Sequence, residues 1–153
     1  MNWLLLHYEL PGTPSKYRVY IWRKLKKFGA CSLMDGLYAL PHSWRTLERF
    51  TWLCSEVKEM RGTAMLWEAT SLLPLQEKAL RKRFDEMVEG RYLALKNVLI
   101  GCNRKEAGCE FIDSCSRQWA DIRWHDWFEH PLGQETLELI NRLRDRAKDG
   151  EGN

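Results

Sequence analysis

Six basic side chains lie close together near the start of the chain, in an interval that contains no acid. No Asp or Glu occurs between Glu9 and Asp35, and the cations of this interval are Lys16, Arg18, Arg23, Lys24, Lys26 and Lys27. The chain has a net charge of +3, and because this interval contributes +6, the remainder carries −3. Clustered cations attract phosphates and displace the counterions of a nucleic acid. The sequence therefore predicts a local nucleic-acid contact on an otherwise slightly acidic protein.

The basic interval has the pattern of one amphipathic helix. Thr13-Pro14-Ser15 supplies a helix start, and Gly29 supplies a stop. At 100° per residue, one face carries Tyr17, Ile21, Leu25 and Phe28, whereas the opposite face carries Lys16, Tyr20, Arg23 and Lys27. We expect the contacts to a nucleic acid to come from Lys16, Arg18, Tyr20, Arg23, Lys24 and Lys27. The alternative is an ordinary solvated helix face.

Arg18 differs from the other cations because its helical angle places it beside Trp22 and Leu25, towards the buried side. A guanidinium in that position needs a polar partner, since its desolvation is costly. One interpretation is a structural bridge from the helix to Glu9, Asp35 or Glu68. The other is a functional site that holds an oxyanion or a phosphate.

Two metal sites are conceivable, and neither has a complete ligand pattern. Glu9 ends the first predicted strand, where a hard carboxylate ligand would be needed by a metal-dependent nuclease. Cys102, Cys109 and Cys115 precede His125 and His130, but structural zinc sites usually pair ligands two to four residues apart. We expect no metal, no cofactor and reduced thiols at all five cysteines.

The first half of the chain alternates predicted strands and helices. Trp3–Leu10 is a strand, Cys31–Leu40 is a hairpin turning at Asp35-Gly36, and Thr63–Leu72 is another strand. Between the last two lies a helix capped by Ser43, with an apolar face made of Leu47, Phe50, Cys54 and Val57. With both helices on one side of the sheet, this order predicts an α+β, ferredoxin-like βαββαβ module over residues 1–73.

The second half is predicted to be helical. We expect helices over 75–100, 105–128 and 134–148, which together form an extension over 74–148, and a disordered polar tail over 149–153. Trp119, Trp124 and Trp127 are expected to pack in the core of this extension, with a ligand pocket or a dimer contact as the alternative. The basic groups at Arg81-Lys82-Arg83 and Arg142–Arg146 alternate with acids, a pattern typical of surface ion pairs.

Composition and missing motifs narrow the function classes. With 153 residues, 44% of them apolar, the chain suits a folded domain rather than a disordered segment. It has no apolar run near the roughly 20 residues of a membrane span, and its start does not have the pattern of a signal peptide, so we expect a cytoplasmic protein. His125 and Asp126 form a candidate acid–base pair, but no nucleophile, P-loop or dinucleotide motif accompanies them. An enzyme is therefore not the favoured class.

Several segments together resemble a known family. WLLLHYELP, PSKYRVYIWRKLKKFGA and LMDGLYALP, followed by the closing stretch Phe111–Ala147 with its IRWHDWFEHP, are similar to the N-terminal domain of the ChrB chromate-resistance regulators. The first module is also similar, more loosely, to the ferredoxin-like domains of phenylacetate-pathway repressors and of CRISPR-associated endoribonucleases. The endoribonucleases carry an acid at the end of the first strand, as Glu9 does here.

The ChrB resemblance implies a transcriptional regulator that binds duplex DNA through this domain. In that family a second domain is associated with chromate sensing, so we expect sensing to depend on a separate domain. A homodimer is expected as well, because two-fold symmetric proteins commonly read operators. The alternative classes are a protein-interaction module that partners a separate sensor domain, and a metal-dependent nuclease using Glu9.

Overall fold

The computed structural model describes residues 1–102 and 107–151. In chain order its elements are β1 (Asn2–Glu9), α1 (Lys16–Lys27), β2 (Cys31–Met34), β3 (Leu37–Pro41), α2 (Trp44–Glu59), β4 (Thr63–Thr70), α3 (Pro74–Ile100), α4 (Cys109–Trp124) and α5 (Pro131–Glu151). The chain divides into two compact units, Met1–Lys78 and the part from Ala79 onwards. This division lies inside α3, a few residues after the boundary predicted at 73/74.

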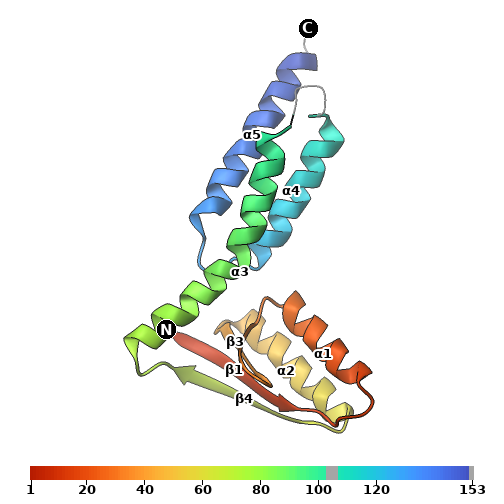
Figure 1. Cartoon of the computed structure of the whole chain (residues 1–153), viewed down its shortest axis with the longest axis vertical. Helices are drawn as coiled ribbons and strands as arrows, with labels where there is room; N and C mark the ends of the chain where they lie inside the picture. Colours follow the sequence, from red (N-terminus) through yellow and green to blue (C-terminus); the bar gives the residue numbers. More distant parts are fainter. Residues whose placement is uncertain (103–106, 152–153) are drawn as a thin grey trace. The chain divides into compact units, whose positions relative to one another are not determined.

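The first unit contains a four-stranded antiparallel sheet with the strand order β2-β3-β1-β4. Helices α1 and α2 lie beside one another on one side of this sheet (Figure 1). The predicted α+β class, the order of strands and helices and the helical C-terminal part are confirmed. The finer assignment of the unit to the ferredoxin-like fold stays a prediction.

The core of the first unit is built from alternate residues of β1 and from one face of each helix. Leu4 and Leu6 are buried, and Ile21 and Leu25 of α1 and Phe50, Leu53 and Val57 of α2 are fully or almost fully buried too. Side chains two apart in a strand share a face, so the spacing of Leu4 and Leu6 fits a strand covered on that side. The covered side fixes which side chains α1 leaves to solvent.

The end of α1 and the turn of the hairpin both have the structure that the sequence predicted. Gly29 has a φ of 70°, and the N–H of Ala30 donates to the carbonyl of Leu25 at 3.1 Å, which closes the end of α1. Asp35-Gly36 forms the predicted turn between β2 and β3. Gly36 has a φ of 73°, and its carbonyl accepts a 2.8 Å hydrogen bond from the N–H of Tyr8.

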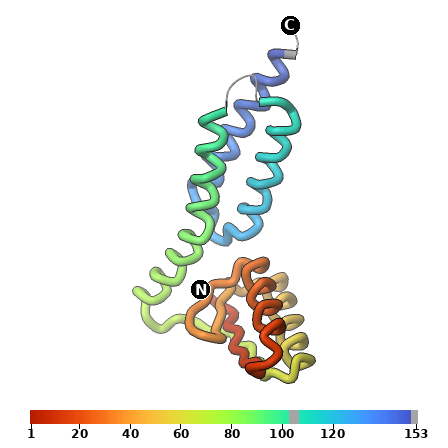
Figure 2. Tube along the Cα trace, turned by 45° about the vertical axis from the view of Figure 1, so that its right-hand side comes forward, coloured from red at the N-terminus to blue at the C-terminus, as the bar shows by residue number. Residues whose placement is uncertain are grey.

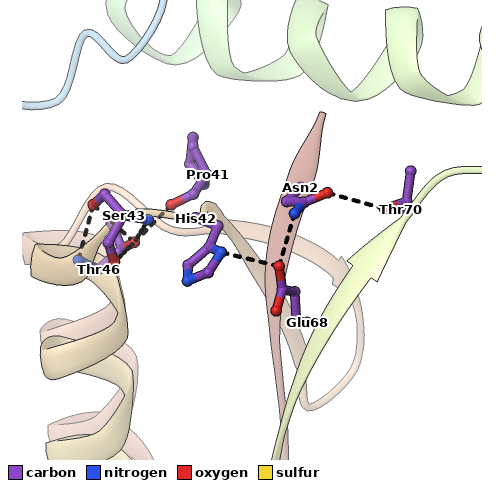
Figure 3. Close-up of polar contacts among 7 residues, drawn as sticks. All are labelled: Asn2, Pro41, His42, Ser43, Thr46, Glu68 and Thr70. Carbon is purple, nitrogen blue, oxygen red and sulfur yellow. Dashed lines mark hydrogen bonds and ion pairs between the residues drawn. The ribbon is translucent and has the colours of Figure 1, made fainter.

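The capping box at the start of α2 corrects the predicted apolar face of that helix. The Ser43 hydroxyl accepts from the N–H of Thr46, and the Thr46 hydroxyl donates to the carbonyl of Pro41 at 2.6 Å (Figure 3). These bonds turn Thr46 inward, so the buried face is Thr46, Phe50, Leu53 and Val57. The prediction was wrong for Leu47, which is 40% exposed, and for Cys54, which is only half-buried.

The second unit packs its helices side by side around one apolar cluster (Figures 1 and 2). Among the buried residues of this cluster are Val88, Tyr92, Leu95, Leu99, Ile112, Cys115, Ile122 and Ile140. Helix α4 ends at Trp124, so Trp127 and Phe128 are not on it as predicted, and Lys105 lies outside the described residues. Helix α5 begins at Pro131 rather than Gln134, because proline suits the first position of a helix.

The end of the chain also differs from the sequence-based expectation. Helix α5 continues through Glu151, so Asp149 and Gly150 are helical and do not belong to a disordered tail. The last two residues of the predicted tail, 152–153, lie outside the described residues. Within the described part of the chain, no helix has the length and apolar character needed to cross a membrane.

Candidate nucleic-acid interface

Helix α1 presents most of its cations to solvent. Its first turn contains no acid, and Lys24, Lys26 and Lys27 lie in its last turn, where cations favour the negative end of the helix dipole. The exposed cations are Lys16, Arg18, Arg23, Lys26 and Lys27, whereas Lys24 is half-buried. The buried side of the helix, at Ile21 and Leu25, lies opposite Arg23. The face of α1 that carries Lys16, Arg23 and Lys27, called the basic face below, is therefore accessible to solvent.

Three of these lysines lie over aromatic rings of the same helix. The Nζ atom of Lys26 is 4.4 Å from the ring centroid of Trp22, and that of Lys24 is 5.6 Å from the ring of Tyr20. Lys16 Nζ is 5.5 Å from the ring of its neighbour Tyr17. Such contacts hold an ammonium group against an apolar surface while it stays hydrated on its other side.

Tyr20 has an intramolecular partner that the sequence did not indicate. Its hydroxyl donates a 2.9 Å hydrogen bond to Oε1 of Glu56 on α2. This hydrogen bond and the charge of Glu56 raise the pKa of Tyr20. The predicted hydrogen bond from Tyr20 to a phosphate would have to replace the one to Glu56, and a carboxylate at this place repels a phosphate.

Arg18 does not lie on the face of α1 that carries Lys16, Arg23 and Lys27. It is exposed rather than turned towards the core. Within the described residues, no carboxylate oxygen is within 4.0 Å of its guanidinium, so the predicted bridge to Glu9, Asp35 or Glu68 is not formed. The carboxylate of Glu68 instead accepts from the side-chain amide of Asn2 at 2.7 Å and lies 3.2 Å from Nδ1 of His42 (Figure 3).

Arg18 lines an open cleft of about 680 Å³ in the first unit. The end of β1, the flank of α1 and the β2–β3 turn form its walls, with His7, Tyr8, Glu9, Leu10, Arg18, Val19, Trp22, Asp35, Gly36 and Tyr38. The sequence indicated Arg18 and Glu9 separately, and the structure brings them into one cavity. The tyrosines were missed as site residues. The positions of Tyr8 near the end of β1 and of Tyr38 just after the turn are the signal that could have indicated them.

Two stacked tyrosines form the aromatic part of the cleft. The rings of Tyr8 and Tyr38 have centroids 6.1 Å apart and planes inclined by 27°. Burial, with the nearby Tyr38 and the negative charge of Asp35, raises the pKa of Tyr8 to about 12, whereas Arg18 acts in the opposite direction. Arg18 and Asp35 are therefore both close enough to Tyr8 to influence its ionisation.

The metal-site candidates have no ligand cluster in the described part of the chain. Glu9 is exposed at the end of β1, and no group of three or more His, Cys, Asp or Glu side chains able to hold an ion occurs among the described residues. Cys115 is buried, whereas Cys109 is exposed at the start of α4. Burial raises the pKa of the Cys115 thiol, with a smaller contribution from Cys102.

The tryptophan-rich segment supports the second unit. Trp119 packs against the apolar cluster, and its Nε1–H donates to the carbonyl of Gly133 at 2.7 Å. This confirms the expected core role for Trp119, whereas Trp124 is 49% exposed.

The acid–base pair considered for His125 and Asp126 is not formed. The Asp126 carboxylate is buried and accepts from the hydroxyl of Tyr92 at 2.9 Å and from the N–H of His130 at 3.0 Å. Nδ1 of His125 instead lies 3.1 Å from Nη1 of Arg91. Asp126 therefore joins α3 to the start of α5 and has a structural role.

One member of each of the other two basic groups forms an ion pair of the kind expected. Lys82 pairs with Glu86 at 3.6 Å, and Arg144 lies 3.8 Å from Asp113 and donates to the hydroxyl of Ser116. Arg81 lies over the ring of Phe128. Exposed ion pairs of this kind contribute only about 0–1 kcal/mol.

Comparison with known proteins gives a consistent family. The family model described as "Protein ChrB, N-terminal" matches residues 18–125, a span that includes Arg18, Tyr20, Arg23, Lys24 and Lys27. The chain is also 31% identical over 87 residues to Protein ChrB of Cupriavidus metallidurans, and this match covers 57% of the chain but only 27% of that relative. The match to the family model extends from the basic helix into the helices of the second unit. The chain therefore belongs to the family of the ChrB N-terminal domain.

Proposed function

We propose that this protein is a DNA-binding transcriptional regulatory protein of chromate resistance, and that helix α1 supplies its main contacts to duplex DNA. The observation that carries the proposal is the set of exposed cations on one helix whose first turn has no acid. Lys16, Arg23 and Lys27 share the side of α1 that faces away from the core. This side is the one available to a phosphate backbone.

Electrostatics supports this assignment. Each phosphate neutralised by a lysine or an arginine releases condensed counterions, so even three to five contacts give binding that depends steeply on salt. The negative charge of the rest of the chain favours an orientation in which α1 meets the DNA. Preference for one DNA sequence requires contacts to the bases or recognition of DNA shape. The contacts of α1 to the phosphate backbone would position the protein for such recognition.

The link to chromate rests on the ChrB family membership and on the resemblance of the motifs. The chain matches 27% of the length of its relative. We propose that this part of the family's protein makes the DNA contact. We propose a ferredoxin-like arrangement for the first unit and a two-fold symmetric dimer on the DNA. A dimer would present two copies of α1 to the two halves of an operator.

A gel-shift experiment at low salt tests the proposal. Lys16, Arg23 and Lys27 are changed together to Glu, and the probe is duplex DNA from upstream of the gene. The matched control changes Arg142, Arg146 and Lys148 of α5 to Glu, three exposed cations of the second unit, which alters the net charge equally. We expect the α1 variant to lose retention and the α5 variant to keep most of it.

Two outcomes contradict the proposal. Retention that is unchanged in the α1 variant would remove α1 as the contact surface. If the wild-type protein fails to bind duplex DNA at low salt but binds a separate sensor domain tightly, the protein is an interaction module instead. Circular dichroism of both variants shows whether they are folded.

A further inference from the structure

We propose that the cleft between β1, α1 and the β2–β3 turn binds a nucleoside monophosphate unit whose base carries an exocyclic amino group. The unit is either a free nucleotide or an unpaired nucleotide at the end of a nucleic acid. This proposal rests in part on the proposed DNA-binding function, because the same helix supplies both surfaces. It assigns Arg18 and Trp22 to a different site from Lys16, Arg23 and Lys27.

The aromatic side chains of the cleft suit a flat ring. Tyr8 and Tyr38 stack with planes 27° apart, and Trp22, which is 47% exposed, lines the same cavity from α1. Stacking of a nucleobase on such side chains contributes about 1–3 kcal/mol for each base. Trp22 is also covered by Lys26, 4.4 Å from its centroid, which places a second cation near the cleft.

Arg18 supplies the anion-binding group. Its guanidinium has no carboxylate within 4.0 Å in the described part of the chain, and it lies close enough to the Tyr8 hydroxyl to affect its ionisation. An exposed arginine on the wall of a cavity presents its donors as a fork, which suits the oxygens of a phosphate. Arg18 and the aromatic side chains line the same cavity, so a phosphate bound by Arg18 would share the cavity with the rings.

The acids of the cleft select the base. Glu9 and Asp35 line the cavity at the end of β1 and in the turn, and a carboxylate only accepts hydrogen bonds. Bases with an exocyclic amino group donate to such oxygens, whereas a carbonyl in the same place is repelled. The combination of a cation, an aromatic pair and two acids therefore favours adenine over hypoxanthine on the same ribose phosphate.

The size of the cavity agrees with this ligand. Sites for small molecules usually measure about 300–1,000 Å³, and the cleft measures about 680 Å³. Gly36 lines the cavity, and a Cβ atom there would lie 2.5 Å from the carbonyl oxygen of Tyr8. The close approach of turn and strand keeps Asp35 and Tyr38 in place beside Tyr8.

Isothermal titration calorimetry on the full chain tests the assignment, with AMP as the probe. Inosine monophosphate replaces the amino group by a carbonyl, adenosine lacks the phosphate, and inorganic phosphate lacks the ring. The variants are Arg18→Gln and Trp22→Ala, both at exposed positions, and Arg142→Gln on α5 is the charge-matched control. We expect AMP to bind at least fivefold more tightly than each of the three other ligands.

We expect Arg18→Gln and Trp22→Ala each to weaken AMP binding about tenfold or more, while Arg142→Gln leaves it unchanged. To separate the two sources, a duplex with one unpaired 3′ adenosine is compared with the blunt duplex. A preference for the overhang that disappears in Arg18→Gln indicates a nucleic-acid end, and tight AMP binding without such a preference indicates a free nucleotide.

The proposal is overturned if AMP does not bind at millimolar concentration, if inorganic phosphate alone binds as well, or if inosine monophosphate equals AMP. The variant with Lys16, Arg23 and Lys27 changed to Glu separates a failure of this proposal from a failure of the proposed DNA-binding function. Loss of duplex binding with intact AMP binding supports both sites. Loss of AMP binding in Arg18→Gln with intact duplex binding shows that the cleft and the DNA face act independently.

Discussion

The hydroxyl of Tyr20 on α1 donates a 2.9 Å hydrogen bond to Oε1 of Glu56 on α2. This contact places a carboxylate at one border of the basic face that is proposed to meet DNA. The face therefore has a favourable side, at Lys16, Arg23 and Lys27, and an unfavourable side next to Tyr20. The charge of Glu56 becomes a direct means of adjusting DNA affinity.

Glu56→Gln is expected to strengthen binding to duplex DNA. The change keeps a hydrogen-bond acceptor for Tyr20 but removes the negative charge that faces an approaching phosphate. We expect the dissociation constant at low salt to fall by about two- to fivefold, and the gain to shrink as salt screens the charge. Fluorescence anisotropy with labelled duplex measures both, and Glu138→Gln on α5 is the control at an exposed carboxylate. Weaker binding by Glu56→Gln would contradict the orientation of the interface.

Gly36→Ala is expected to destabilise the first unit by about 1–3 kcal/mol. Gly36 has a φ of 73°, and an added Cβ would lie 2.5 Å from the carbonyl oxygen of Tyr8, which is backbone and cannot move aside. The free energy of unfolding from urea denaturation measures the effect. Gly12→Ala is the matched control, because a Cβ at Gly12 would meet nothing within 4 Å. Equal stability of the two variants would show that the turn is built differently.

Asp126→Ala is expected to cost about 2–3 kcal/mol of stability in the second unit. The change leaves the Tyr92 hydroxyl and the N–H of His130 without their shared acceptor. Tyr92→Phe removes the hydroxyl donor together with its hydrogen bond to Asp126, so it leaves no unpaired donor and should cost less stability than Asp126→Ala. In a double-mutant cycle, the two changes together should cost less than the sum of the single effects. Strict additivity would mean that the Tyr92–Asp126 hydrogen bond does not stabilise the unit.

Raising the pH above 10 is expected to destabilise the wild-type protein more than Tyr8→Phe. The pKa of Tyr8 is raised from 10.0 to about 12 by burial, by the nearby Tyr38 and by the charge of Asp35. Below pH 10 the folded and unfolded chains both hold this proton, so Tyr8 has no effect on the pH dependence. Between pH 10 and 12 only the unfolded chain releases it, and the free energy of unfolding therefore falls.

Urea denaturation at pH 9 and at pH 11 measures this difference. Tyr8→Phe should lose less stability between the two pH values, whereas the contributions of the other tyrosines remain in both proteins. An identical loss in wild type and variant would show that Tyr8 is not shielded from solvent in the folded protein.

Local signals predicted much of the fold because they depend on few residues. Gly29, Asp35-Gly36 and Ser43 all have the structural roles expected of them, since turns and caps are decided by backbone conformation and short-range hydrogen bonds. On α2, Phe50 and Val57 are buried as predicted, whereas Leu47 and Cys54 were mispredicted because Thr46, which bonds to Pro41, takes an inward position instead. Nothing in the apolar spacing alone reveals that bond.

The candidate site was predicted in part for the same reason. A charge cluster on one helix is visible in the sequence, so the basic face was found. The cleft is formed by Tyr8, Arg18, Asp35 and Tyr38, which come from separate elements and meet only when β1 pairs with β3. The exposure of Arg18 and the Tyr20–Glu56 contact depend on how the helices pack, and helical angles alone do not determine this.

The salt dependence of duplex binding tests the central claim most directly. The dissociation constant is measured from 50 to 200 mM salt for the wild type and for a variant with Lys16, Arg23 and Lys27 changed to Gln. Each lost phosphate contact should make the slope of log K against log salt shallower by about 0.9, or about 2.7 for all three. This change of slope, with weaker binding at every salt concentration, is the predicted result. A slope and an affinity equal to those of the wild type would contradict the assignment of α1 as the DNA-binding surface.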